Sequence, residues 1–218
     1  MEVENILDHT VSYVKSELAE AESGHDFWHV ERVWKLSSYI ADREQYQNIA
    51  VDLGALLHDI ADAKFHNGNE DIAIEKTSTF LSSIDVAPSV REEVLYIIKN
   101  ISYRSSLERD IDKSMALQIV QDADRLDAIG AIGIARAFNY GGYRNRPLYD
   151  PRIPIVRHQS KEEYRGSTAP TIHHFYDKLL RLKDQMNTET GRLLAEERHV
   201  FLEQYLDQFF REWNVEGL

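Results

Sequence analysis

Apolar residues recur every three to four positions along almost the whole of this 218-residue chain. The segment from Val90 to Ile101 shows the pattern most cleanly, because Val90, Val94, Ile98 and Ile101 share one side of a helix with 3.6 residues per turn. No segment has the sustained apolar/polar alternation of a half-buried strand. The pattern therefore predicts an all-α fold. We expect helices over residues 5–22, 25–42, 48–60, 70–84, 113–127, 128–138, 171–186 and 188–213, with one more that opens at Pro88.

Proline and glycine mark the ends of these helices. Pro88 is followed by Ser89 and Glu92, a spacing that predicts a helix start with a capping box. Residues 139–170 contain four of the five prolines and two adjacent glycines, so they predict a long loop of the kind that often covers a binding site. With 218 residues, 43% of them hydrophobic, the chain can bury a full core, and we expect one domain over residues 1–218.

Composition narrows the class of ligand. The net charge of −12 disfavours a nucleic-acid polymer, because polyanion binding needs a basic surface, whereas a small phosphorylated ligand needs only a local cationic pocket. The chain has no cysteine, which excludes disulfides, thiolate zinc sites and cysteine nucleophiles. No apolar run approaches the roughly 20 residues that span a bilayer, and the first residues do not resemble a signal peptide. We therefore expect a cytoplasmic protein with a small-molecule partner, and a homodimer is left open.

Four side chains are candidates for one metal site. His29 lies on the second predicted helix, His58 and Asp59 end the third, and Asp124 lies on the helix over 113–127. Burying such groups beside apolar neighbours is costly unless something pairs them. Two imidazoles and two carboxylates form a mixed nitrogen and oxygen set that suits octahedral Mn, Fe, Ni or Mg. The spacing alone is equally compatible with a polar helix end at His58 and Asp59 and a solvated Asp124.

A second metal arrangement is disfavoured. His25 and His29 are four residues apart with Asp26 between them, which mimics the H-E-x-x-H motif of zinc proteases. Aspartate is one methylene shorter than the glutamate base of that motif, and no third ligand follows at the expected distance. We interpret His25 instead as a helix-start residue or a contact to substrate phosphate.

The order of these residues resembles a known family. His29, the His58-Asp59 doublet and Asp124 are similar to the H…HD…D signature of the HD-domain metal-dependent phosphohydrolases, an all-α superfamily. The flanking runs Gly24–Val33, Ala55–Ile60, Gln121–Ala128, Phe175–Leu180, Met186–Thr190 and Glu196–Arg198 resemble its bacterial YedJ/YpgQ-like branch. The resemblance implies one HD-type helical bundle, with a metal-site core at about 24–140, a loop at 141–170 and C-terminal helices at 171–214. It implies His29, His58, Asp59 and Asp124 as ligands of one divalent cation, with Mn favoured and Mg, Fe or Ni as alternatives.

Such an ion polarises a phosphoryl oxygen and activates a water molecule. Asp62 is the candidate that orients or deprotonates this water, because it shares the face of His58 and Asp59 if their helix continues. Lys64 is a candidate for neutralising phosphate charge. Arg32 and Asp127, each three residues past a predicted ligand, are further candidates for binding substrate. The alternatives are a surface carboxylate at Asp62, a surface lysine at Lys64, and ion pairs at Arg32 and Asp127.

Differences between this sequence and the motifs of other branches of the superfamily narrow the choice of substrate. Alarmone hydrolases of the superfamily carry H-D-x-x-E-D, from which the run His58-Asp59-Ile60-Ala61-Asp62 differs. The run Gly142-Tyr143-Arg144 lacks the Gly-Tyr-Pro signature of the cyclic-di-GMP phosphodiesterases. The YedJ/YpgQ-like branch implies hydrolysis of (deoxy)nucleoside triphosphates to monophosphate and pyrophosphate. A nucleoside 5′-monophosphatase and a non-catalytic, metal-containing nucleotide sensor are the alternatives.

Overall fold

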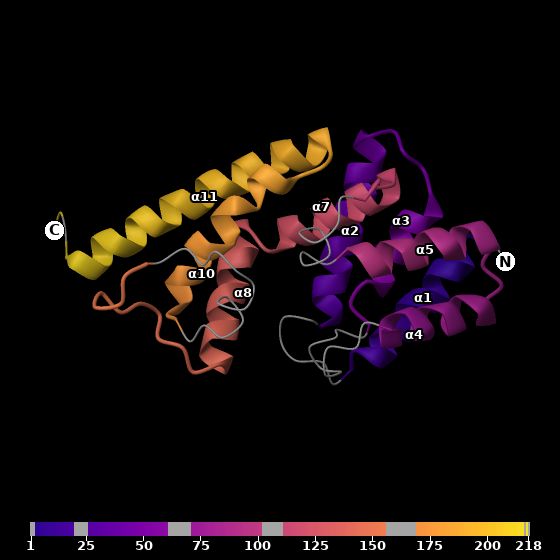
Figure 1. The fold of residues 1–218 in the computed structure, drawn as a ribbon, viewed down its shortest axis with the longest axis horizontal. Coiled ribbons are helices and arrows are strands. Elements are labelled where there is room, and N and C mark those ends of the chain that lie inside the picture. The colour runs from indigo at the N-terminus through magenta and orange to yellow at the C-terminus, as the bar shows by residue number, and fades with distance from the viewer. Residues whose placement is uncertain are drawn as a thin grey trace. The chain divides into compact units, whose positions relative to one another are not determined.

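The structure, a computed structural model, describes residues 3–19, 26–60, 71–101, 111–155, 169–215 and 217. Within these ranges the chain forms nine α-helices and two short 3-10 helices and contains no strand, which confirms the predicted all-α fold (Figure 1). The α-helices are α1 (Val3–Glu17), α2 (Phe27–Arg43), α3 (Ile49–Leu57), α4 (Asp71–Ser83), α5 (Pro88–Asn100), α7 (Met115–Asp127), α8 (Gly130–Tyr143), α10 (Thr171–Asp177) and α11 (Glu189–Asn214). None of the helices among the described residues is long and apolar enough to cross a membrane.

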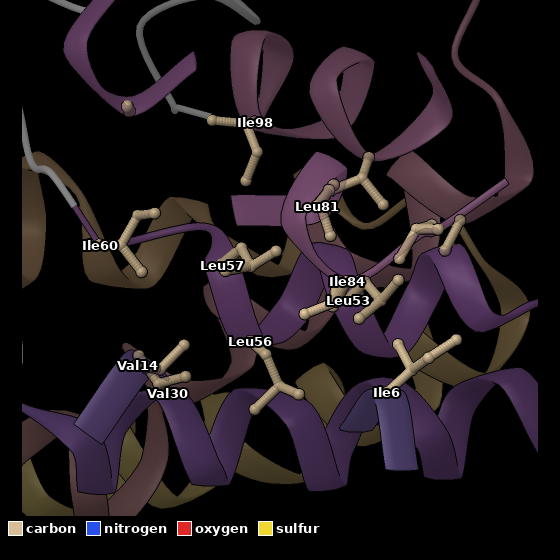
Figure 2. Close-up of a cluster of buried hydrophobic side chains, with 14 of the residues drawn as sticks. Ile6, Val14, Val30, Leu53, Leu56, Leu57, Ile60, Leu81, Ile84 and Ile98 are labelled. Carbon is tan, nitrogen blue, oxygen red and sulfur yellow. The ribbon is translucent and has the colours of Figure 1, made fainter. Parts of the chain in front are cut away.

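The chain folds as two compact units, residues 1–124 and 125–218. The first unit is built around α3, which packs against α1, α2 and α5. Seven of the nine α3 residues are buried, and all seven are apolar or glycine, as expected for a helix that is surrounded by others. Figure 2 shows the core of this unit, where Leu53, Leu56 and Leu57 of α3 lie among Ile6, Val30 and Leu81 from neighbouring helices.

The second unit contains α8, α10, the 3-10 helices η2 (Leu179–Arg181) and η3 (Lys183–Gln185), and α11. Aromatic side chains join its elements. Phe138 of α8 contacts the rings of Phe175 on α10 and Phe209 on α11. Tyr149 packs edge-on against Phe209 and Trp213, with ring centroids 6.3 and 5.2 Å away. Tyr149 thus anchors the segment that follows α8 to α11.

Two local predictions are wrong. Helix α5 begins at Pro88 as expected, but the predicted capping box at Ser89 and Glu92 is not formed, because the N-cap is Ala87, whose side chain cannot accept a hydrogen bond. The helix expected over 171–186 ends at Asp177. Lys178 leaves the helical conformation there, with φ −134° and ψ −57°, and 3-10 turns follow. The spacing nevertheless marked the buried positions correctly, because Leu179, Leu182 and Met186 are all buried.

The boundary of the predicted loop is also wrong, because α8 continues to Tyr143. Gly141, one of the two adjacent glycines of the expected loop, lies within α8 at a close helix contact. A Cβ atom at this position would lie 2.1 Å from the Thr171 hydroxyl oxygen of α10. The glycine is therefore required by the approach of α10 and not by a turn. Of the expected loop, residues 156–168 lie outside the described residues.

Candidate metal centre

The start of α2 positions the first predicted ligand. Asp26 is the N-cap, and its carboxylate accepts a hydrogen bond of 3.0 Å from the backbone N–H of His29. The helix therefore begins at Phe27, two residues later than expected. His29 lies in the first turn, on the same face as Val30 and Val33, and its side chain is 2% exposed. Burial on this face directs the imidazole toward α3.

The end of α3 positions the second histidine and fixes its tautomer. His58 is the C-cap residue, and its Nδ1 lies 2.7 Å from the carbonyl oxygen of Ala55. A carbonyl oxygen can only accept a hydrogen bond, so Nδ1 carries a proton, and in the neutral ring Nε2 then keeps its lone pair. Metal-ligating histidines usually have such an outer partner, which holds the ring and leaves the other nitrogen available. Ala55 was not identified from the sequence, because a backbone carbonyl leaves no signal in a side-chain pattern.

The donor atoms of all four predicted ligands converge. His58 Nε2 lies 3.3 Å from His29 Nε2, and Asp124 Oδ1 lies 3.5 Å from His29 Nε2 and 4.0 Å from His58 Nε2. Asp59 Oδ2 is 4.0 Å from His29 Nε2. One ligand atom from each of His29, His58 and Asp59 lies within 4.8 Å of the other two, so these three residues form a candidate metal site.

These separations fit a six-coordinate divalent ion. With ligand bonds of about 2.1 Å, adjacent ligands of an octahedron lie about 3.0 Å apart and opposite ligands about 4.2 Å. The four separations given above, from 3.3 to 4.0 Å, lie between these limits. Two carboxylates beside two imidazole nitrogens also provide the negative charge and lone pairs that a cation requires. The residues present therefore fit the implied metal.

The site opens toward solvent at Asp124. The side chains of His29, His58 and Asp59 are 2%, 5% and 11% exposed, whereas that of Asp124 is 38% exposed. Among the four candidate ligands, Asp124 is therefore the one that solvent reaches most readily.

Of the remaining predicted site residues, only Arg32 and Asp127 lie among the described residues. His25, Asp62 and Lys64 lie outside the described residues. Arg32 lies on α2, one turn after His29, and is partly buried. Asp127 is buried in the second unit, and its carboxylate accepts a 2.6 Å hydrogen bond from Arg136. This is the ion pair that was given above as the alternative to substrate binding at Asp127. Contacts of Arg32 and Asp127 with a substrate stay predictions.

Proteins of similar sequence and structure are known. The model of the HD domain matches residues 27–129, a range that contains His29, His58, Asp59 and Asp124. The Bacillus subtilis protein YpgQ is 37% identical over 203 residues, which are 92% of this chain and 90% of YpgQ. The crystal structure of YpgQ in complex with ADP has a TM-score of 0.73 at 36% identity and covers 94% of this chain and 97% of that one.

Two other crystal structures match over nearly their full length. An HD-superfamily hydrolase from Bacillus thuringiensis has a TM-score of 0.78 at 38% identity, covering 99% of this chain and 100% of that chain. A Lactobacillus plantarum protein has a TM-score of 0.84 at 36% identity, with the same coverage. The likeness therefore includes both the metal-site helices and the C-terminal helices.

Proposed function

The chain belongs to the HD-domain family, as its motifs predicted, and from this premise we propose that it is a divalent-metal-dependent nucleotide phosphohydrolase. The observation that carries the proposal is the convergence of His29 Nε2, His58 Nε2 and an Asp59 carboxylate oxygen within 4.8 Å. Asp124 is the fourth proposed ligand, because its Oδ1 faces both imidazoles. When bound at this set, a divalent cation such as Mn²⁺ supplies Lewis-acid activation of a phosphoryl oxygen and of a water molecule.

A nucleotide is the proposed substrate because the relative YpgQ was crystallised with ADP. The reaction proposed first is the cleavage of a (deoxy)nucleoside triphosphate to monophosphate and pyrophosphate. The oxygen of water bonds to the α-phosphorus, the bond from that phosphorus to the bridging oxygen breaks, and pyrophosphate leaves. Asp62 is proposed to accept the proton of the water. His25, Arg32, Lys64 and Asp127 are proposed to contact the substrate.

The chain's own residues keep the centre in one geometry. The Ala55 carbonyl holds the His58 ring with Nε2 toward the site, and the N-cap bond at Asp26 fixes the turn that carries His29. Both histidines are thus held before substrate arrives, so binding does not have to order them. Preorganisation of this kind reduces the reorganisation that accompanies the chemical step.

The test uses chelator-treated protein titrated with Mn²⁺ and incubated with nucleoside mono-, di- and triphosphates. Orthophosphate and pyrophosphate are measured separately. Pyrophosphate from triphosphates is the expected product, whereas orthophosphate from monophosphates would favour the 5′-monophosphatase. Tight nucleotide binding without either product would favour the sensor. A protein that neither binds Mn²⁺ nor turns over any nucleotide would refute the proposal.

Matched variants assign the chemistry to the proposed centre. His58→Gln and Asp59→Asn should lose Mn²⁺ binding together with turnover. The control is His9→Gln on α1, because His9 is exposed and its Nδ1 lies 2.8 Å from a local carbonyl oxygen, that of Asn5. Asp62→Asn should lower kcat strongly while Mn²⁺ stays bound, and a kcat within a few-fold of wild type would remove Asp62 from the proposal.

A further inference from the structure

Helices α2 and α3 form a hairpin that brings the two histidines together. Only five residues, 44–48, connect them, and Asn48 caps the start of α3 by accepting a hydrogen bond of 2.9 Å from the Ala50 N–H. His29 lies in the first turn of α2, and His58 directly follows the last residue of α3. The imidazoles are therefore at the open end of the hairpin. Their separation depends on how far one helix is displaced along the other.

A polar contact crosses this hairpin beside the mainly apolar buried faces of α2 and α3. Asp52 Oδ1 accepts a hydrogen bond of 2.7 Å from the indole Nε1 of Trp34. The Ser38 hydroxyl lies 2.9 Å from the same oxygen and 3.0 Å from the Trp34 carbonyl oxygen, so its one proton can be donated to either. Trp34 and Ser38 are four residues apart on α2, so they share one face of that helix. Because the acceptor is a carboxylate, a hydrogen bond to Asp52 is charge-assisted. We refer to Asp52, Trp34 and Ser38 as the hairpin clamp.

The clamp lies on the same two helices as His29 and His58. Trp34 follows His29 by five residues, about 7.5 Å along α2, and Asp52 precedes His58 by six residues, about 9 Å along α3. The two helices are antiparallel, so the step from Trp34 back to His29 on α2 and the step from Asp52 on to His58 on α3 go in the same direction in space. The pair Trp34–Asp52 and the pair His29–His58 therefore connect the same two helices at points about one and a half turns apart.

Apolar packing by itself does not specify this register well. The buried faces of α2 and α3 consist mainly of small and aliphatic side chains, whose attraction is non-directional. A hydrogen bond is directional and has a narrow range of donor–acceptor distances, about 2.7–3.2 Å, so the 2.7 Å bond from Trp34 to Asp52 favours one register. Sliding of the two helices would also change the 3.3 Å separation of the imidazole nitrogens, because His29 and His58 lie at the ends of the same two helices.

We propose that Asp52 is a positioning residue for the metal centre, which it serves by locking the register of α2 against α3 through Trp34 and Ser38. This inference rests on the proposed function, since it requires that the centre binds a divalent cation. The plainer role of Asp52 is a favourable charge in the first turn of α3, where it interacts with the helix dipole. That role affects stability but not metal affinity, so the two can be separated.

The experiment measures Mn²⁺ dissociation constants of chelator-treated proteins by calorimetry, together with urea unfolding of the metal-free forms. Trp34→Phe removes only the indole donor and keeps an aromatic ring, and Asp52→Ala removes the acceptor. Each should weaken Mn²⁺ binding about tenfold, in the range seen for outer-sphere partners of metal ligands. The double variant Trp34→Phe/Asp52→Ala should be no weaker than Asp52→Ala, because both changes break the same bond.

The matched control is Ile84→Val, which removes one core methylene in the first unit and changes neither α2 nor α3. It should lose stability and keep the wild-type Mn²⁺ affinity. The inference is overturned if Trp34→Phe and Asp52→Ala lower stability but leave the dissociation constant within twofold. It is equally overturned if Ile84→Val weakens Mn²⁺ binding as much as they do. A wild-type protein without Mn²⁺ affinity would overturn the proposed function together with this inference.

Discussion

Gly54 lies where α3 packs closely against Ile97 of α5. A Cβ atom at position 54 would lie 2.8 Å from Cδ1 and 3.1 Å from Cγ2 of Ile97, both shorter than ordinary carbon contacts. Gly54→Ala should gain about 1 kcal/mol of helix propensity and lose about 1–3 kcal/mol to overpacking. The net expectation is a loss of about 1 kcal/mol in the free energy of unfolding.

A second substitution tests whether the contact with Ile97 is the cause. Ile97→Val deletes Cδ1 and should by itself cost about 1 kcal/mol. In the double variant Gly54→Ala/Ile97→Val the new methyl group occupies the space that Cδ1 leaves, so total volume is nearly conserved. The pair should lie within about 1 kcal/mol of wild type instead of at the sum of the two losses, which is about 2 kcal/mol.

Urea denaturation of the chelator-treated protein measures these differences without a contribution from bound metal. Gly142→Ala is the matched control, because a Cβ at this α8 position would meet no atom within 4 Å. It should raise stability by about 0.5–1 kcal/mol. The reasoning is refuted if Gly54→Ala stabilises as Gly142→Ala does, or if the losses of the double variant simply add.

Three further predictions concern the second unit. Burial and two neighbouring cations lower the pKa of His174 from 6.5 to about 3, so the unfolded chain takes up a proton before the folded one as pH falls. Stability should therefore be lost from about pH 6.5 downward, by about 1–2 kcal/mol between pH 7 and pH 5 in urea denaturation, and His174→Gln should flatten this dependence. Thr188→Ala removes the N-cap of α11, whose hydroxyl accepts a 2.9 Å bond from the Gly191 N–H, and should cost about 1 kcal/mol that Thr188→Ser restores. Asp127→Asn leaves Arg136 without its buried carboxylate and should cost about 2 kcal/mol, whereas an unchanged stability with a raised KM would indicate the substrate role instead.

The helices and the candidate ligands could be predicted from the sequence because both depend on local patterns. The spacing of Val94, Ile98 and Ile101 identifies one buried face whatever packs on it. His58 and Asp59 follow an apolar helix, a position at which polar groups need a partner, and their order after His29 matches the family signature. Helix ends were less predictable, because a residue such as Gly141 is compatible with both a turn and a close helix contact.

The tertiary structure decided how these parts meet. The carbonyl of Ala55 on His58, the pairing of Asp127 with Arg136, and the approach of Gly141 to Thr171 depend on backbone positions that no local pattern encodes. The hairpin clamp is of the same kind, because Asp52 follows Trp34 by 18 residues and meets it only when α2 and α3 pack in one register. By itself, then, the sequence determined which side chains are available to a metal ion. The register of the helices set the distances between them, because register is a property of packed surfaces and not of either helix alone.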